Sequence, residues 1–558
     1  MEEIITKKPC AVQKIETSQG FSILYKEHFL YSKYNPSKNI ISAVENLQLL
    51  PGTIILCNSP LLCYGLSELL QKLPQNCLVI LCEAEKELFD FCQNEKTFDF
   101  NDNRIITVTP EKLNDLPFLV YDLAEQGIYK RVIKIDFSAG VQFNKEYYDK
   151  LFAACTDSVM TFWKNRITLT KFGRRYSKNL FENLKTLGES KPVTDYFETV
   201  EKPIIVFGAG ESTQTAIDGL LRRFSLLNNK LSDFFILCAD TALQPLLKNG
   251  IKPDGVFVEE AQSVIVKAFI GVPSDIQIFA GLSSIPNISH KTQSKNISYF
   301  FTEYTKASFI EGLKTQSFMP PANKPFGSVG LTAVYYALKF RKNTDVPVYV
   351  AGLDFSYSTG STHTKGALAH ILRLISSNRL NSIANYSAAF GPGTEKIYGK
   401  KGNSFVTSVT LKNYAAMFRG FFEGTENLFD IGQTGIDLGL PVVSMDCHVA
   451  NAPCNDSSAS ASKKDAAPRH CETKGRGNPV KEDIKVFLQD EHKALERLRD
   501  LLTGKTELKD DKLLEEIQKI AEPREYLYLH FPDGCRFSTD QSFLNSIRTE
   551  IDFFLKYM

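Results

Sequence analysis

The sequence has no apolar run long enough to span a membrane, no excess of either charge and no C-x-x-C pair. The first absence excludes a membrane-spanning helix, which needs about 20 apolar residues. The 65 basic and 64 acidic residues leave a net charge of +1, which predicts neither nucleic acid nor a membrane as a partner, although it says nothing of local basic patches. The amino terminus lacks the apolar core of a signal peptide, and the twelve cysteines lie mostly within apolar runs. We therefore expect a cytoplasmic protein without disulfide bonds.

One group of cysteines and histidines is the candidate metal site. It comprises Cys447, His448, Cys454, His470 and Cys471. The stretch between them has a flexible composition and no zinc-ligand spacing, so we predict no metal site here.

The length of 558 residues exceeds what one hydrophobic core supports, so we predict several domains. Changes in composition place an amino-terminal domain at 1–195, a central domain at 196–445, a flexible linker at 446–480 and a helical domain at 481–558. One helical face of the last domain carries Ile484, Phe487, Leu488, Leu495, Leu498, Leu501 and Leu502. This stripe predicts packing among the carboxyl-terminal helices.

The amino-terminal domain is predicted to be a Rossmann-like α/β fold. Apolar runs indicate buried strands at 52–58 and 77–82, a helix at 60–73, and further strands at 104–110 and 131–136. Glu83 follows the second strand, where a nucleotide-binding fold carries an acid. The loop after the first strand, Asn58-Ser59-Pro60, lacks the glycines that let a backbone approach phosphate. We therefore expect a scaffold or partner-binding role here.

The central domain alternates apolar strands with amphipathic helices. The sequence PIIVFGAGESTQTAIDGL begins it, and strands ending in Asp240, Glu259, Gly281 and Asp354 follow. This order predicts a parallel, doubly wound, Rossmann-like sheet. Because the carboxyl ends of parallel strands meet at one edge, we expect the residues that follow them to form one rim.

The rim residues are of the types that bind a nucleotide. Glycine turns and helix N-termini suit phosphate, and carboxylates accept hydrogen bonds from ribose or from a base amine. The candidate nucleotide-binding residues are Gly208, Gly210, Glu211, Ser212, Asp240, Thr241, Glu260, Gln262, Gly327 and Ser328. The first glycine turn alone is a weak fingerprint, because Thr213 stands where a dinucleotide-binding motif has its third glycine.

A polar loop, GLDFSYSTGSTHTKGA, follows the last of these strands. Asp354, Tyr357, His363 and Lys365 supply a carboxylate, a hydroxyl, an imidazole and a cation. Such groups can stabilise a departing phosphate or take a proton from an acceptor. We take these four residues as the candidate catalytic residues.

Several of these stretches together resemble the motility accessory factor glycosyltransferases. The resemblance covers residues 196–440 and rests on PIIVFGAGESTQTAIDGL, CADTALQPLLKNGIKPDGVFVEEAQ, PFGSVGLTAVYYAL and GLDFSYSTGSTHTKG, which stand in the family's order. The family has the same three-part layout, and its core is similar to bacterial family 42 sialyltransferases.

The resemblance implies transfer of a nonulosonic acid from a CMP-activated donor to serine or threonine of flagellin. It implies that Tyr357 and His363 lie near the leaving CMP phosphate. It also implies that Gly208, Gly210, Ser212, Asp240 and Glu260 line the nucleotide pocket. No cofactor is required by this reaction, and because the region has no D-x-D motif, a divalent metal is not required either.

Three departures from the family pattern affect the site. Glu211 stands where the family usually has proline, and Glu260-Ala261-Gln262 replaces D-P-Q. No histidine lies between His370 and His448, so His363 and His370 are the candidates for the general base.

Two other functions remain open from the sequence. The core also resembles 6-hydroxymethylpterin diphosphokinases, which use ATP and magnesium, and Asp240, Glu260 and Asp354 are candidate ligands for that metal. The other function is a flagellin-binding or assembly protein without activity, which Glu211 and the missing downstream histidine favour.

Overall fold

The computed structural model describes residues 12–98, 100–227, 231–286, 288, 296–359, 362–380, 390–443, 481–534 and 536–558. The chain forms two compact units, one of residues 1–172 with 529–537 and one of residues 173–528 with 538–558. The division falls inside the long helix α5 (Lys145–Leu187), whereas the sequence placed the first boundary near residue 195. The predicted linker and the cysteine and histidine group at 447–471 lie outside the described residues. None of the described helices combines the length and apolar character needed to cross a bilayer.

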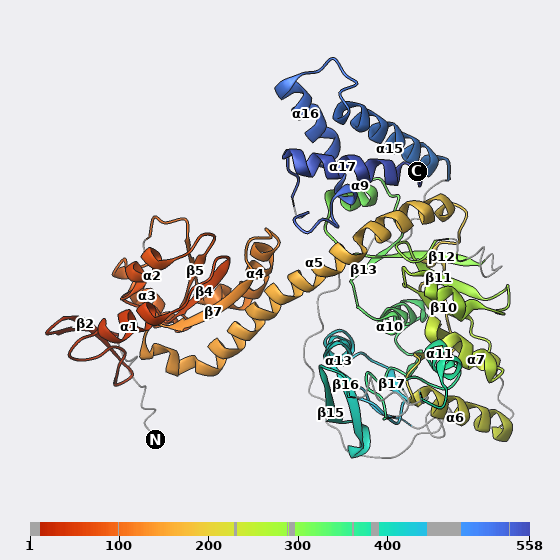
Figure 1. Ribbon diagram of the computed structural model, residues 1–558. Coiled ribbons are helices and arrows are strands. Elements are labelled where there is room, and N and C mark those ends of the chain that lie inside the picture. The colour runs from red at the N-terminus through yellow and green to blue at the C-terminus, as the bar shows by residue number, and fades with distance from the viewer. Residues whose placement is uncertain are drawn as a thin grey trace. The chain divides into compact units, whose positions relative to one another are not determined.

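The first unit contains a parallel four-stranded sheet in the order β6-β5-β4-β7 (Figure 1). Every residue of β4 and β5 is buried, because both sheet faces are covered. The elements of this unit are β1 (Gln13–Thr17), β2 (Gly20–Tyr25), β3 (His28–Phe29), α1 (Lys38–Asn46), β4 (Thr53–Asn58), α2 (Leu66–Lys72), β5 (Leu78–Cys82), α3 (Lys86–Asn94), β6 (Ile105–Val108), α4 (Leu116–Ala124), β7 (Arg131–Asp136) and the first part of α5.

The helix expected at 60–73 begins later than the sequence indicated. Ser59, Leu61, Cys63 and Gly65 all have positive φ angles, and α2 begins only at Leu66. An α-helix needs negative φ throughout, so the apolar residues before Leu66 form a partly buried turn instead.

Glu83, the acid after β5, is buried and already has internal partners. Its carboxylate accepts hydrogen bonds from the Ser59 hydroxyl at 2.7 Å, the Glu85 N–H at 2.9 Å and the Tyr148 hydroxyl at 3.3 Å. Burial raises the pKa of Glu83 to about 7, although these hydrogen bonds oppose the shift. These contacts support a structural role for this acid.

The raised pKa of Glu83 predicts a pH-dependent effect on stability. A carboxyl whose pKa is higher in the folded state favours folding below its unfolded pKa and loses that contribution as pH rises to about 7. In Glu83→Gln, the free energy of unfolding relative to that of the natural protein should therefore be roughly 2 kcal/mol higher at pH 8 than at pH 5, because glutamine does not titrate. Fluorescence of Trp163, the single tryptophan, reports this unit. An equal effect of the substitution at both pH values would contradict the prediction.

The second unit contains an eight-stranded sheet in which every pairing is parallel, in the order β13-β12-β11-β10-β9-β8-β14-β17. The predicted Rossmann-like, doubly wound fold is thus confirmed. Its strands are β8 (Ile204–Phe207), β9 (Phe235–Ala239), β10 (Gly255–Val258), β11 (Gln277–Gly281), β12 (Ile297–Thr302), β13 (Ala322–Asn323), β14 (Val348–Ala351) and β17 (Leu428–Asp430), with β15 (Thr394–Tyr398) and β16 (Ser404–Ser408) forming a separate antiparallel pair.

Helices cover this sheet and bury its aromatic core. The described helices between β8 and β17 are α6 (Ser212–Leu227), α7 (Leu243–Lys248), α9 (Ser308–Thr315), α10 (Val329–Phe340), α11 (Leu368–Ser376), which has no buried residue, and α13 (Val409–Phe422). The apolar helix α10 contacts β8, β9, β10 and β14 (Figure 1). Phe257 and Phe279 stack with ring centroids 4.8 Å apart, and Tyr336 and Phe340 of α10 pack on them. This core fixes the strand ends that carry the candidate site.

The carboxyl-terminal helices α15 (Lys481–Leu502), α16 (Asp510–Ala521) and α17 (Gln541–Phe554) pack against one another, as the apolar stripe predicted. Ile484, Leu488, Leu495, Leu498 and Leu501 are buried, while Phe487 and Leu502 are half-buried. The buried Glu491 on the same helix accepts hydrogen bonds from Arg524 and from the Tyr526 hydroxyl.

Candidate functional site

The candidate site lies where the strand order of the larger sheet reverses. From β8 the chain continues to β9 and on to β13 on one side, and it returns to β14 and β17 on the other. Open α/β sheets bind ligands outside the carboxyl ends of the strands at such a point. The turn after β8 and the turn after β14 therefore determine which polar groups lie at the site.

These two turns pack directly on each other. The Gly208 N–H donates to the Ala351 carbonyl at 2.8 Å, and the Gly210 N–H donates to the Gly352 carbonyl at 2.9 Å. A Cβ on Gly208 would lie 2.3 Å from the Gly352 oxygen. Gly352 has a φ of +71°, and a Cβ there would lie 1.9 Å from the Thr213 hydroxyl oxygen. These glycines allow two backbone turns to approach each other.

Asp354 occupies the amino-terminal end of α6. The Ser212 N–H donates to its Oδ2 at 2.7 Å, and the Ser212 hydroxyl donates to its Oδ1. Burial raises the pKa of Asp354 to about 6, although both Ser212 hydrogen bonds oppose the shift. A negative charge at a helix N-terminus is favourable, and here the protein's own carboxylate provides it. A ligand phosphate would have to displace Asp354 to bind the Ser212 N–H group.

A buried ion pair extends this network. Lys400 pairs with Asp430 at the end of β17, and its Nζ also donates to the Gly432 carbonyl at 3.2 Å. The Gly432 N–H donates to Asp430 Oδ1 at 2.7 Å. Burial raises the pKa of Asp430, and the charge of Lys400 opposes that rise. Neither residue is predicted from the sequence, where the only indication is a position beside glycine turns.

The loop that carries Tyr357, His363 and Lys365 is anchored to the turn after β8. The Glu211 carboxylate accepts hydrogen bonds from the Ser358 N–H at 3.2 Å and from the Ser358 hydroxyl at 2.6 Å. The Thr364 N–H donates to the Ala209 carbonyl at 3.0 Å. Glu211, the residue in place of the family's proline, therefore holds this loop.

The three predicted catalytic side chains of the loop lie in different environments. Tyr357 is buried, and its backbone exchanges two 2.9 Å hydrogen bonds with Val406. His363 is half-buried with Nδ1 3.1 Å from the Thr362 hydroxyl, and burial, followed by the charge of Arg373, lowers its pKa. Lys365 is exposed.

Asp240, at the end of β9, is a buried acid with one unpaired oxygen. Its Oδ1 accepts a hydrogen bond from the Thr241 N–H at 2.6 Å, but its Oδ2 has no hydrogen-bond partner among the described residues. Burial raises the pKa of Asp240 to about 7, opposed by the Thr241 N–H and assisted by Glu260 and Glu259. Burying a carboxyl oxygen without a hydrogen-bond partner costs free energy. We therefore expect this atom to accept a hydrogen bond from a ligand.

The polar loop lies over the helix that follows Asp240. A Cβ on Gly366 would lie 3.5 Å from Lys248 Cδ and 3.7 Å from Pro245 Cα, and both residues belong to α7. Because α7 begins directly after Asp240-Thr241-Ala242, the structure brings the loop and Asp240 to the same part of the rim.

The remaining predicted residues surround the ends of β10 and β13. Glu259 accepts hydrogen bonds from the Thr302 hydroxyl and, at 2.7 Å, from the Thr332 hydroxyl in the first turn of α10. Glu260 accepts one from the N–H of the exposed Gln262 at 2.8 Å. Gly327 and Ser328 precede α10, and a Cβ on Gly327 would lie 2.7 Å from the Tyr414 ring.

Two asparagines of α5 hold loops of the rim, although the sequence does not predict them as site residues. The Asn179 side chain donates to the carbonyls of Ala261 at 3.2 Å and Ser283 at 3.1 Å. The Asn183 side chain donates to the carbonyls of Leu282 and Ser284. Their i, i+4 spacing places both side chains on one helix face. This spacing is the sequence pattern that could have indicated a shared role. They fix the loops after β10 and β11.

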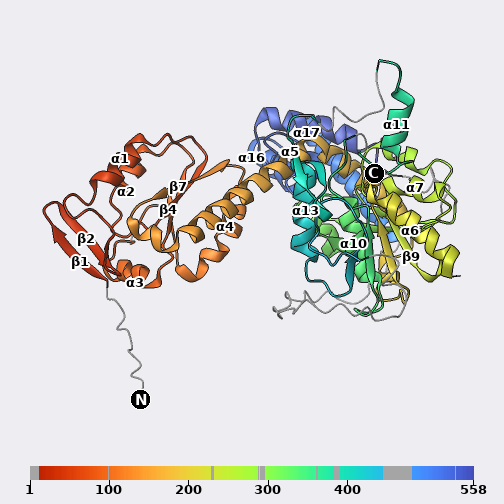
Figure 2. The ribbon, with the colours of Figure 1, turned by 90° about the horizontal axis from the view of Figure 1, so that it is seen from below.

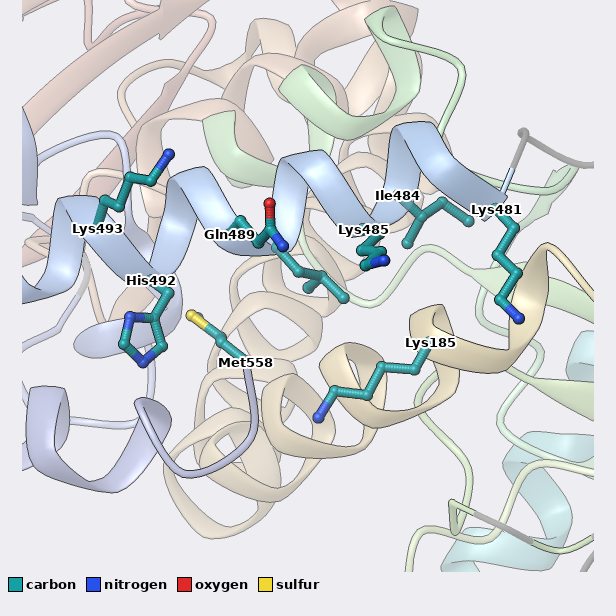
Figure 3. A pocket seen from close by; sticks show the side chains of 9 residues that line it. Lys185, Lys481, Ile484, Lys485, Gln489, His492, Lys493 and Met558 are labelled. Carbon is teal, nitrogen blue, oxygen red and sulfur yellow. The ribbon is translucent and has the colours of Figure 1, made fainter.

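A hollow of about 460 Å³ lies away from this rim, between α15 and the end of α5 (Figure 3). Lysines line it, but three of them already have carboxylate partners: Lys481 pairs with Glu189, Lys485 with Glu482 at 3.9 Å, and Lys493 with Asp490 at 3.2 Å. It contains none of the predicted site residues.

The candidate magnesium ligands do not form a cluster. Among the described residues, no group of three or more histidine, cysteine or acidic side chains is arranged to hold a metal ion. Asp354, one of the three acids considered, accepts hydrogen bonds from Ser212.

Comparison with protein families finds a match over the rim-bearing part of the chain. Residues 175–360 match the family described as 6-hydroxymethylpterin diphosphokinase MptE-like. The matched segment begins within α5 and ends within the polar loop, so it includes Asn179, Asp240 and Tyr357.

Two proteins resemble the chain over nearly its whole length. An uncharacterized protein of Treponema pallidum (strain Nichols) is 30% identical over 568 residues, which cover 98% of this chain and 94% of that protein. The structure of the MAf glycosyltransferase from Magnetospirillum magneticum AMB-1 has a TM-score of 0.55 at 12% identity, covering 99% of this chain and 91% of that one. At this identity the second comparison establishes a shared fold.

Proposed function

Because this chain belongs to one family with the Treponema pallidum protein, contains an MptE-like domain and has the fold of a motility accessory factor glycosyltransferase, we propose that it is a glycosyltransferase. The finer proposal is that it transfers a nonulosonic acid from a CMP-activated donor to a serine or threonine of flagellin. The observation that supports this most is the buried, unpaired Oδ2 of Asp240, which directly precedes the helix contacted by Gly366 of the loop that carries Tyr357, His363 and Lys365.

The rim offers a separate group for each task of the reaction. The bond between the sugar and the CMP phosphate breaks as the acceptor hydroxyl oxygen bonds to the sugar, and CMP leaves with the bonding electrons. Lys365 and Tyr357 stabilise the charge on the departing phosphate. His363 takes the proton of the acceptor hydroxyl, and its lowered pKa keeps the imidazole neutral and able to do so at pH 7.

Asp240 is proposed to bind the nucleotide of the donor. Its Oδ2 is positioned to accept a hydrogen bond from a ribose hydroxyl or from the cytosine amine. An ionised carboxylate accepts such a bond, whereas the protonated acid, which its raised pKa favours below about pH 7, accepts it poorly. The bound ligand would thus satisfy an oxygen that lacks a partner among the described residues.

This role predicts that CMP affinity rises with pH. With a pKa of about 7 for Asp240, the ionised fraction, and hence the affinity, should increase roughly tenfold from pH 6 to pH 8. The Asp240→Asn variant should bind CMP more weakly and lose this increase. Titration calorimetry measures both, and because the CMP phosphate titrates identically in the two proteins, their difference isolates Asp240. The same pH dependence in both proteins would contradict the role.

A pterin diphosphokinase is the second candidate, and the match of residues 175–360 to the MptE-like family favours it. That reaction would bind ATP with magnesium at the same rim, but Asp240, Glu260 and Asp354 are not arranged among the described residues as a group that could hold the metal. Because the hydrogen bonds from Ser212 engage Asp354, a metal would have to displace them.

A further inference from the structure

Helix α11 turns its apolar face to solvent. Leu368, Ile371, Leu372 and Ile375 recur at i, i+3, i+4 and i+7 and therefore share one face. Ile371, Leu372, Leu374 and Ile375 are 37%, 40%, 47% and 76% exposed. No residue of α11 is buried. A helix that packs on a core buries its apolar face and exposes its polar side. The apolar face of α11 is exposed instead, so we expect it to contact a partner outside the fold.

The polar side of α11 is turned toward the protein. His370 and Arg373 lie opposite the apolar face, and both are half-buried. The Gly366 N–H donates to His370 Nδ1 at 3.5 Å, and the charge of Arg373 acts on His363 and Tyr357. The orientation of the helix is therefore set by polar contacts to the candidate loop.

The segment around α11 carries positive charge without any acid. Residues 355–394 contain no aspartate or glutamate but contain Lys365, Arg373 and Arg379. None of these three cations has a carboxylate partner among the described residues. Lys365 and Arg379 are exposed and flank the helix on either side. The local charge thus differs from the nearly neutral chain, and it is complementary to an anionic surface.

We propose that α11 lies on the surface of an anionic lipid bilayer, with its apolar face among the acyl chains and its flanking cations at the headgroups. A short helix with an apolar face and basic residues on the other side and at its ends is typical of interfacial membrane helices. Figure 2 shows α11 projecting from the second unit. The cations at and beside the helix, with no acid in residues 355–394, favour an anionic surface over a groove that would take the apolar face alone.

This contact would hold the candidate loop near the membrane. α11 begins at Leu368, two residues after Gly366, so binding of the helix places His363 and Lys365 beside the bilayer. The inference does not depend on the proposed glycosyltransferase activity, because lipid binding is measured without nucleotide or acceptor.

Vesicle sedimentation tests the proposal on the full chain. The protein should bind vesicles of equimolar phosphatidylcholine and phosphatidylglycerol and not vesicles of phosphatidylcholine alone. Replacing Leu372 and Ile375 together by serine should weaken binding at least about tenfold. Arg379→Gln should weaken it about fivefold, the effect of one cation near such a surface. Both changes affect exposed side chains, so circular dichroism should be unchanged.

A matched variant controls for general loss of apolar surface. Val486 and Leu514 are 53% and 40% exposed and lie in the same unit, on the carboxyl-terminal helices α15 and α16. Their joint replacement by serine should leave vesicle binding within about twofold of the natural protein. The proposal is overturned if the natural protein does not bind anionic vesicles, or if the α11 variant binds as well as it does. It is also overturned if the α11 variant converts a dimer to a monomer in solution, since a second copy would then cover this face.

Discussion

Replacing His363 by alanine should lower the rate of sugar transfer by about a hundredfold or more, the usual contribution of a general base. Burial and the charge of Arg373 lower the pKa of His363. The neutral imidazole can therefore accept the acceptor's proton at pH 7. The rate of the natural protein should fall on acidification only below pH 6.5, the ordinary pKa of histidine.

Two other histidines provide matched controls for this prediction. His370 already accepts a hydrogen bond from Gly366, so His370→Ala should reduce the rate much less than His363→Ala. His492 lies on α15, away from the rim, and its replacement by alanine should leave the rate unchanged. The opposite result, a hundredfold loss in His370→Ala and no loss in His363→Ala, would identify His370 as the general base.

Replacing Asp354 by alanine should lower the free energy of unfolding by roughly 3 to 5 kcal/mol, the cost of breaking a buried charge network. The change leaves the Ser212 N–H without its acceptor and takes a negative charge from beside Lys400. The single tryptophan lies in the other unit, so calorimetry or circular dichroism is the suitable measurement.

Asparagine at this position separates a structural role from a catalytic one. Asp354→Asn keeps one acceptor for Ser212, so its loss of stability should be well below that of the alanine variant. If Asp354→Ala instead unfolds like the natural protein but no longer binds nucleotide, the carboxylate serves the ligand, as the sequence suggested, and does not cap α6.

The sequence predicted the sheet and the rim because buried parallel strands are continuous apolar runs. The strand ending at Phe207 and the strand ending at Ala351 were recognisable in this way, and polar residues directly after them had to meet at one edge. The predicted Rossmann-like fold is accordingly confirmed, and it is shared with the MAf glycosyltransferase of Magnetospirillum magneticum. The individual site roles stay predictions.

What the sequence did not predict depends on contacts between distant residues. Gly208 was interpreted as a phosphate turn, yet its close neighbour is Gly352, and nothing local to either residue indicates that pairing. The catalytic role of Asp354 stays a prediction, and its hydrogen bond from Ser212, which lies 142 positions away, could not be read from the sequence. Likewise, the pairing of Lys400 with Asp430 depends on how two turns pack.

Titration calorimetry with CMP, set against ATP plus magnesium on the same preparation, tests the central claim most directly. We predict that CMP binds, and that a joint Tyr357→Phe and His363→Ala variant binds it more weakly. Binding of ATP with magnesium in place of CMP would contradict the glycosyltransferase proposal in favour of the diphosphokinase. Failure of both nucleotides to bind would contradict both enzyme proposals and leave a protein that keeps this fold without the activity.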